Sequence, residues 1–143
     1  MKRLLLLIMA VMAFAGMSFA QDVYSIGNFT SGKQGVKIYK NGELLQTVNP
    51  STANLSACDI HRFNDKIVFA HENTDNTIGV VGTYDPVTHT QDFASLGSDS
   101  YVYEIMSSNA IWAVGYKKNG SIYNATAWTV DGTTVTVQHT YTN

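Results

Sequence analysis

Four histidines, one cysteine and two regularly placed acidic residues are the side chains of this 143-residue chain that could carry out chemistry. The histidines occupy positions 61, 71, 89 and 139, without the short spacings typical of metal ligands. His61 and His71 fall on neighbouring strands of a predicted hairpin, but a turn at Asn64 would not place them opposite one another. We interpret all four as surface or packing residues, and the sequence predicts no metal site and no cofactor.

Two acidic residues, Asp59 and Glu104, each precede an isoleucine and lie 45 residues apart on predicted strands. Two carboxylates that line a channel could hydrolyse a glycosidic bond, whereas strand carboxylates that point into solvent have no catalytic role. We favour the second interpretation, because the chain lacks the glycine-rich phosphate loop and the Gly-x-Ser-x-Gly, His-Glu-x-x-His and Cys-x-x-Cys patterns. The sequence therefore predicts no catalytic residue and a protein that is not an enzyme.

The single cysteine, Cys58, allows no disulfide within the chain. A reactive thiolate needs an electropositive, partly exposed environment, and the neighbouring Ala57 and Ile60 favour a buried, inert thiol instead. The segment 72–76, which reads Glu-Asn-Thr-Asp-Asn, is rich in oxygen ligands but lacks the glycine and the distal glutamate of a calcium-binding loop. We interpret this segment as a plain turn.

The first 20 residues have the three parts of a secretory signal peptide. Lys2 and Arg3 form the positive end, Leu4–Ala15 is an apolar run of 12 residues, and Ser18 and Ala20 are the small residues of a cleavage site. Spanning a bilayer takes about 20 apolar residues, so the run is too short for a stable transmembrane helix. We expect cleavage after Ala20, a secreted or periplasmic protein, and no stable membrane insertion after cleavage.

The segment 21–143 carries seven Lys and Arg residues against eleven Asp and Glu residues, a net charge of −4 with neutral histidines. Nucleic-acid-binding domains present a basic surface, so a nucleic-acid partner is not expected. A protein or glycan partner is compatible with this charge.

This segment is predicted to be all-β, because short runs of Val, Ile, Thr and aromatic residues alternate with turn signals such as Asn41-Gly42, Asn64-Asp65 and Asp131-Gly132. No stretch shows a helical stripe of apolar residues. The predicted strands are Asp22–Asn28, Gly35–Lys40, Leu44–Val48, Ala57–Phe63, Lys66–Glu72, Ile78–Tyr84, Thr90–Ser95, Tyr101–Ser107, Ala110–Tyr116, Tyr123–Val130 and Thr134–His139.

An internal repeat of about 44 residues organises these strands. Runs of similar sequence begin at Val23, Ile67 and Ile111, 44 residues apart, and an aromatic residue follows each run on the next strand, at Tyr39, Tyr84 and Trp128. A period of 40–50 residues with four strands per unit is typical of β-propeller blades. The sequence predicts one domain over 21–143, with antiparallel four-stranded repeats starting near 22, 66 and 110.

The segment 22–27, Asp-Val-Tyr-Ser-Ile-Gly, and the segment 39–42, Tyr-Lys-Asn-Gly, resemble the secreted β-propeller repeat proteins of Bacteroidetes. The second repeat departs from that pattern, with His71 where glycine is usual and Asp85-Pro86 in place of Asn-Gly. The resemblance implies a propeller fold in which the aromatics that recur with the repeat pack between blades. Their alternative role is to stack on a sugar. We also expect both tryptophans, Trp112 and Trp128, in the core.

The strand count is three, then four, then four, so the first blade lacks its inner strand. A propeller usually closes with at least four blades. Three explanations stay open: a piece of a larger propeller, a subunit that completes a ring by association, or a small open β-stack or β-sandwich. Exposed blade edges and faces would in each propeller case favour self-association.

We expect a secreted, non-catalytic binding module of β-propeller type. The alternatives are a carbohydrate-binding, lectin-like module and a fragment or subunit of a larger propeller enzyme. The longer connections are rich in Ser, Thr and Asn, and recognition usually involves such loops on a rigid scaffold. We therefore expect any ligand there, with no single residue preferred, in the segments 28–34, 49–56, 72–77, 96–100 and 117–121.

Overall fold

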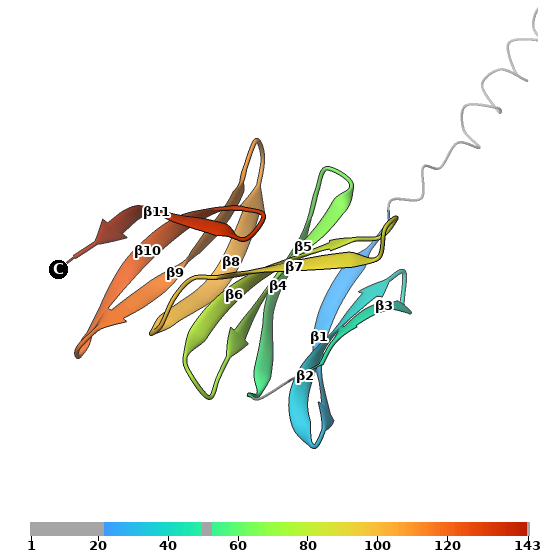
Figure 1. Ribbon diagram of the computed structural model, residues 1–143, viewed down its shortest axis with the longest axis horizontal. Coiled ribbons are helices and arrows are strands. Elements are labelled where there is room, and N and C mark those ends of the chain that lie inside the picture. The colour runs from blue at the N-terminus through green and yellow to red at the C-terminus, as the bar shows by residue number, and fades with distance from the viewer. Residues whose placement is uncertain (1–21, 50–52, 143) are drawn as a thin grey trace, which may run out of the picture.

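The computed structural model describes residues 22–49 and 53–142, which form antiparallel β-strands joined by turns (Figure 1). Each predicted strand is present, with ends that differ by at most three residues from those expected. The predicted leader, residues 1–20, lies outside the described residues. The strands are β1 (Tyr24–Ser31), β2 (Lys33–Lys40), β3 (Glu43–Val48), β4 (Leu55–Phe63), β5 (Lys66–Asn73), β6 (Ile78–Asp85), β7 (Thr90–Ser95), β8 (Ser100–Ser107), β9 (Ile111–Asn119), β10 (Ile122–Asp131) and β11 (Thr134–Tyr141).

The strands form three antiparallel meanders, which we call sheet A (β1-β2-β3), sheet B (β4-β5-β6-β7) and sheet C (β8-β9-β10-β11). The all-β prediction and the division into three, four and four strands are therefore confirmed. Within each sheet, every strand pairs with its neighbours in sequence, as short hairpin turns dictate. At one of these turns both Asn41 and Gly42 have positive φ, 52° and 85°, which is the conformation that an Asn-Gly hairpin supplies at low cost. Within the described part of the chain there is no helix that could cross a membrane.

The three sheets stack face to face in chain order, with B between A and C (Figure 1). The first strands of sheets B and C, β4 and β8, lie close together, whereas the outermost strands β7 and β11 barely meet. The stack therefore opens like a fan from the first strands outward, a propeller-like arrangement. We call the face of a sheet that points towards the preceding sheet its front face, and the opposite face its back face.

Two layers of apolar side chains hold the stack together. Between A and B, Val36 and Ile38 pack with Phe69 and Tyr84. Between B and C, a second layer has Trp128 as its largest fully buried side chain. Sheet B contributes to both layers, and accordingly its strand β5 is apolar on both faces, from Ile67 to Ala70. Burial of both faces of the middle sheet is the main source of stability.

Hydrogen bonds from back-face side chains to the next sheet add to this packing. The Asn28 side-chain oxygen accepts the Ala57 backbone N–H at 2.8 Å, which joins A to B. One carboxylate oxygen of Asp59 accepts the Ile105 backbone N–H at 2.8 Å, which joins B to C. Each bond satisfies a backbone donor on the first strand of the following sheet, so these side chains fix the spacing between sheets.

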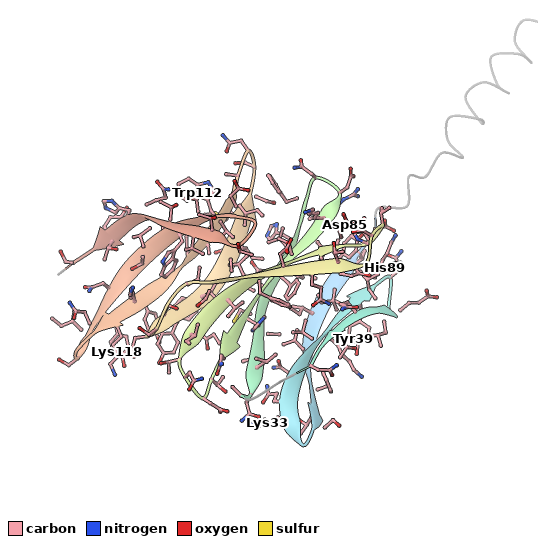
Figure 2. The ribbon with its side chains drawn as sticks, in the orientation of Figure 1. Lys33, Tyr39, Asp85, His89, Trp112 and Lys118 are labelled. Atoms are coloured by element: carbon pink, nitrogen blue, oxygen red, sulfur yellow. The ribbon has the colours of Figure 1, made fainter. Side chains whose placement is uncertain are left out.

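The recurring aromatic residues do not share one environment. Tyr84 and Trp128 are fully buried on the front faces of B and C, as predicted for packing between repeats. Tyr39 is only half-buried, because it lies on the front face of A, which no other described strand covers. The prediction that Trp112 is a core residue is wrong. Trp112 is half-buried on the back face of C, where the sheet has no described neighbour (Figure 2).

Candidate functional site

The histidines do not converge on a site. His61 is exposed, with one ring nitrogen 4.0 Å from the Asp59 carboxylate, and His139 is exposed beside the Tyr141 ring on β11. His89 shares a 2.8 Å hydrogen bond between its Nδ1 and the Tyr84 hydroxyl. In residues 22–49 and 53–142 no three His, Cys, Asp or Glu side chains come close enough together to hold a metal ion.

His71 differs from the others because it is 4% exposed and neither of its ring nitrogens hydrogen-bonds to another described residue. Its ring is stacked on Phe69 and meets Phe93 edge to face, each with centroids 6.1 Å apart. Burial lowers the pKa of His71 from 6.5 to about 4, with a smaller opposing effect of the Glu72 backbone. His71 is therefore a neutral packing residue near neutral pH, as the sequence predicted for its role.

The two acidic residues considered for catalysis are not a matched pair in the fold. Besides the bond to Ile105, Asp59 accepts its neighbour Ile60 N–H at 2.8 Å, so both oxygens are engaged with backbone. Glu104 is exposed, and its register partner Val114 places it on the back face of C. Asp59 thus has a structural role between B and C, whereas Glu104 occupies the equivalent place on an uncovered face.

Cys58 and the acidic turn behave as the sequence indicated. The Cys58 side chain packs against the layer between B and C, and burial raises the pKa of its thiol to about 12. Such a thiol stays protonated and unreactive. In the turn after β5, the Asn73 side chain accepts the Asn76 N–H at 3.2 Å, and Asp75 binds the Asn54 side chain and backbone. These bonds hold the pKa of the Asp75 carboxyl below its usual range.

The longer connections gather at one end of the stack, but their polar groups hold the sheets together. The Asn54 side-chain oxygen accepts the Gln34 N–H at 2.9 Å. About one repeat further along the chain, the Ser100 hydroxyl oxygen accepts the Gly79 N–H at 3.1 Å. Two backbone hydrogen bonds also lie about one repeat apart: Thr74 N–H donates to the Asn54 carbonyl, and Lys118 N–H donates to the Asp99 carbonyl. The described polar groups at this end of the molecule therefore have a structural role.

The largest concentration of exposed aromatic side chains lies on the back face of sheet C. We call this surface the aromatic face. Strand register places its members on one side of β8, β9 and β10, since cross-strand partners share a face. Its aromatic and apolar residues are Tyr101, Tyr103, Met106, Trp112, Val114, Tyr116 and Tyr123, and the charged residues Glu104 and Lys118 lie on the same side.

Four tyrosine rings in this face form a connected cluster. The ring of Tyr116 is central: it stacks on Tyr101 at 4.3 Å between centroids, lies 5.4 Å from Tyr103 and meets Tyr123 edge to face at 5.0 Å. Tyr103 is 64% exposed and Tyr123 55% exposed. Desolvation and a hydrogen bond to Tyr103 raise the pKa of Tyr116, so its hydroxyl remains neutral at physiological pH. The ammonium of Lys118, at the far end of β9 from Trp112, lies 5.7 Å above the Tyr123 ring (Figure 2).

A ring-rich sheet face can stack on a flat apolar surface while its hydroxyls donate and accept hydrogen bonds. Contiguous exposed apolar surface on a soluble protein marks an interaction site more often than scattered apolar residues do. The aromatic face is therefore the candidate site. It lies elsewhere than the longer connections in which we expected a ligand.

A hollow of about 360 Å³ between the hairpin ends of B and C is a weaker candidate. Its lining includes the apolar Phe63 and Ile111 and the carboxylates Asp65, Asp85 and Asp131. Asp85 already accepts two backbone N–H groups of its own turn, at 2.8 and 3.1 Å. The Asp65 side chain is almost fully exposed. These carboxylates therefore do not form a buried, convergent set.

Comparison with known protein families, curated proteins and solved structures finds no match to this chain.

Sequence reasoning missed the aromatic face. Tyr101 and Tyr116 were placed on strands correctly, but no role was predicted for them. One signal was available: in the repeat, Trp112, Val114 and Tyr116 replace Val68, Ala70 and Glu72, 44 residues earlier. This increase in size on one face of sheet C distinguishes that face from the back face of sheet B, which packs on the next sheet of the same chain.

Proposed function

We propose that this protein is a secreted, non-catalytic interaction module of β-propeller type that contacts its partner through the aromatic face. The cluster of Tyr101, Tyr103, Tyr116 and Tyr123, in which Tyr103 and Tyr123 are exposed, is the observation that carries the proposal. Tyrosine and tryptophan are enriched at protein interfaces because they bury a large rigid surface and keep a polar atom available. Rings and hydroxyls beside the charged Glu104 and Lys118 favour a partner surface of mixed apolar and polar character.

The chemistry of the described polar groups supports a role without catalysis. Asp59 is engaged with backbone N–H groups, His71 is neutral and enclosed, and the Cys58 thiol is protonated. None of these groups lies on the aromatic face. Export is supported by the signal-type leader, and an intact-mass measurement of the exported protein should show loss of residues 1–20.

Carbohydrate binding is a second candidate. The stacked pair Tyr101 and Tyr116, flanked by the exposed Tyr103 and Tyr123, presents ring surface and hydroxyl groups side by side. Sugar rings are apolar on one face and bear hydroxyls at their edges, so they match such a surface. Of the three recurring aromatics considered from the sequence as sugar platforms, Tyr84 and Trp128 are fully buried and do not serve this role, whereas Tyr39 is half-buried.

Both candidates are tested by immobilising the exported protein and probing it with an oligosaccharide panel and with cell-envelope proteins. The double variant Tyr103→Ala/Tyr123→Ala removes the most exposed rings of the cluster, and Val87→Ala changes an 80% exposed side chain in a turn away from it. We expect the partner bound by the wild type to be lost from the double variant and retained by Val87→Ala. Equal binding by the double variant would show that another surface is used, and turnover of a bound oligosaccharide would contradict the non-catalytic role.

A further inference from the structure

Two faces of the stack are left uncovered by the described strands: the front face of sheet A and the aromatic face of sheet C. The two interfaces inside the stack show how one sheet of this protein receives the next. Each internal interface joins a back face to a front face, so the two uncovered faces are of complementary type. If the series of sheets continued from one molecule to the next, a second copy of this chain would place its front face of sheet A against the aromatic face of the first copy.

In both internal interfaces, the front face supplies the largest fully buried side chains. Tyr84 and Phe69 on the front of B pack on Val36 and Ile38 of A. The front of C places Trp128 in the layer to which the back of B contributes small side chains, namely Val68, Ala70 and Val81. Between B and C a large side chain thus meets small ones, as close packing requires.

The two uncovered faces differ from their counterparts inside the stack. The aromatic face has Trp112 and Val114 where the back of B has Val68 and Ala70, 44 residues earlier. On β1, the front of A has Ser25 where the front of B has Phe69, again 44 residues apart, and Tyr39 lies opposite Ser25 on β2. Along β1, beside the Tyr39 ring, the front of A therefore offers space where the aromatic face offers volume.

Gly27 extends the small surface on the front of A. A Cβ atom added at Gly27 would find no atom within 4 Å, so the space above this glycine is open. Phe29 is the register partner of Gly35, and the Lys37 ammonium lies 4.9 Å above the Phe29 ring. The front of A is thus a shallow surface with rings and a positive charge beside it.

Polar groups on the two faces match as well. Asp59 on the back of B accepts a backbone N–H of the following sheet, and Glu104 occupies the equivalent place on the aromatic face, exposed. The front of A offers Lys37, of opposite charge, and β1 is an edge strand of its sheet, whose backbone groups on one side have no ladder partner among the described strands. Glu104 has donors available there, as Asp59 has between B and C.

We propose that the aromatic face of one copy receives the front of sheet A of a second copy, head to tail. Since the described residues of one copy form three sheets, two copies would close a ring of six, within the four to eight blades typical of propellers. The inference rests on the proposed interaction role of the aromatic face and names the occupant of that face as the chain itself.

The test uses the exported protein and two single variants, one on each face. Tyr103→Glu puts a charge among the exposed tyrosines, and Gly27→Glu puts one in the open space on the front of A. Neither change meets an enclosed site within a single copy, because Tyr103 is 64% exposed and no atom lies near Gly27. Val87→Glu, in an exposed turn, is the matched control.

Light scattering coupled to size exclusion and sedimentation equilibrium should give the mass of two copies for the wild type and for Val87→Glu. Each face variant should raise the dimer dissociation constant roughly tenfold or more, as expected for a charge in an interface centre. Circular dichroism and the melting temperature check that both variants fold. An equimolar mixture of Tyr103→Glu and Gly27→Glu should regain dimers, because one of the two interfaces in a mixed pair carries neither change.

Three results would overturn the proposal. A wild type that stays monomeric at high micromolar concentration means that copies do not pair. Dissociation caused by Tyr103→Glu alone means that two aromatic faces pair with each other. Mixed variants that stay monomeric mean that the interface is not head to tail. If the wild type is monomeric and the variant Tyr103→Ala/Tyr123→Ala nevertheless loses a glycan or protein partner, only the self-association is refuted and the proposed function stands.

Discussion

Replacing His71 by Phe should abolish a loss of stability that the wild type suffers between pH 7 and pH 5. His71 is 4% exposed, and burial lowers its pKa from 6.5 to about 4. The folded state therefore excludes the proton that the unfolded chain accepts, so acid favours unfolding through this residue. The contribution of neutral His71 to the free energy of unfolding is present above about pH 6.5. It falls as the pH decreases towards 4 and changes no further below that pH.

The size of the effect follows from the two pKa values. With a His71 pKa of 6.5 in the unfolded chain and about 4 in the folded protein, proton linkage lowers the free energy of unfolding by about 0.2 kcal/mol at pH 7 and about 2 kcal/mol at pH 5. A change of about 2 kcal/mol is a large part of the stability of a small domain. Phe at position 71 retains a planar ring between Phe69 and Phe93 and removes two ring nitrogens that have no partner among the described residues.

Urea denaturation at pH 7, 6 and 5 at one fixed protein concentration measures this difference. The free energy of unfolding of the wild type should fall relative to His71→Phe by about 2 kcal/mol over that range. His139→Phe, which changes an exposed histidine, should follow the wild type. Shifts in the pKa of carboxyls such as Asp22 and Asp75 are common to all three proteins and cancel in the comparison. Parallel curves for the wild type and His71→Phe would refute the burial of a neutral imidazole.

Three further experiments test the packing. Trp128→Ala should lower the free energy of unfolding by about 3–5 kcal/mol, and Trp112→Ala by clearly less, because only Trp128 is fully buried; equal losses in chemical denaturation would contradict this difference. Gly82→Ala should cost about 1–3 kcal/mol, since a Cβ atom there would collide with the buried Phe69 ring; an unchanged melting temperature would show that this ring can move aside. The Cys58 thiol should resist iodoacetamide at pH 8 in the native protein and react in denaturant; mass spectrometry that finds rapid native alkylation would show an accessible thiolate.

Strand positions were predictable because they depend on interactions within a few residues. Turns such as Asn41-Gly42 form where residues that accept positive φ interrupt runs of β-branched and aromatic residues, and both signals are visible in one dimension. The 44-residue repeat then assigned the strands to sheets, because the same sequence of hairpins recurs. The residues Tyr84 and Trp128 were predicted to be buried for the same reason, since a repeated position acquires a repeated neighbour.

Only the tertiary structure decided which faces are covered. Trp112 occupies the repeat position of Val68, and the repeat predicted the same burial for both, yet one lies in a layer between two sheets and the other on a face with no described neighbour. The same difference separates the buried Tyr84 from the half-buried Tyr39. Local sequence fixes a side chain's direction relative to its own strand, because side chains alternate along the backbone. Whether that direction leads to a core, to solvent or to a binding surface depends on which sheet packs against it.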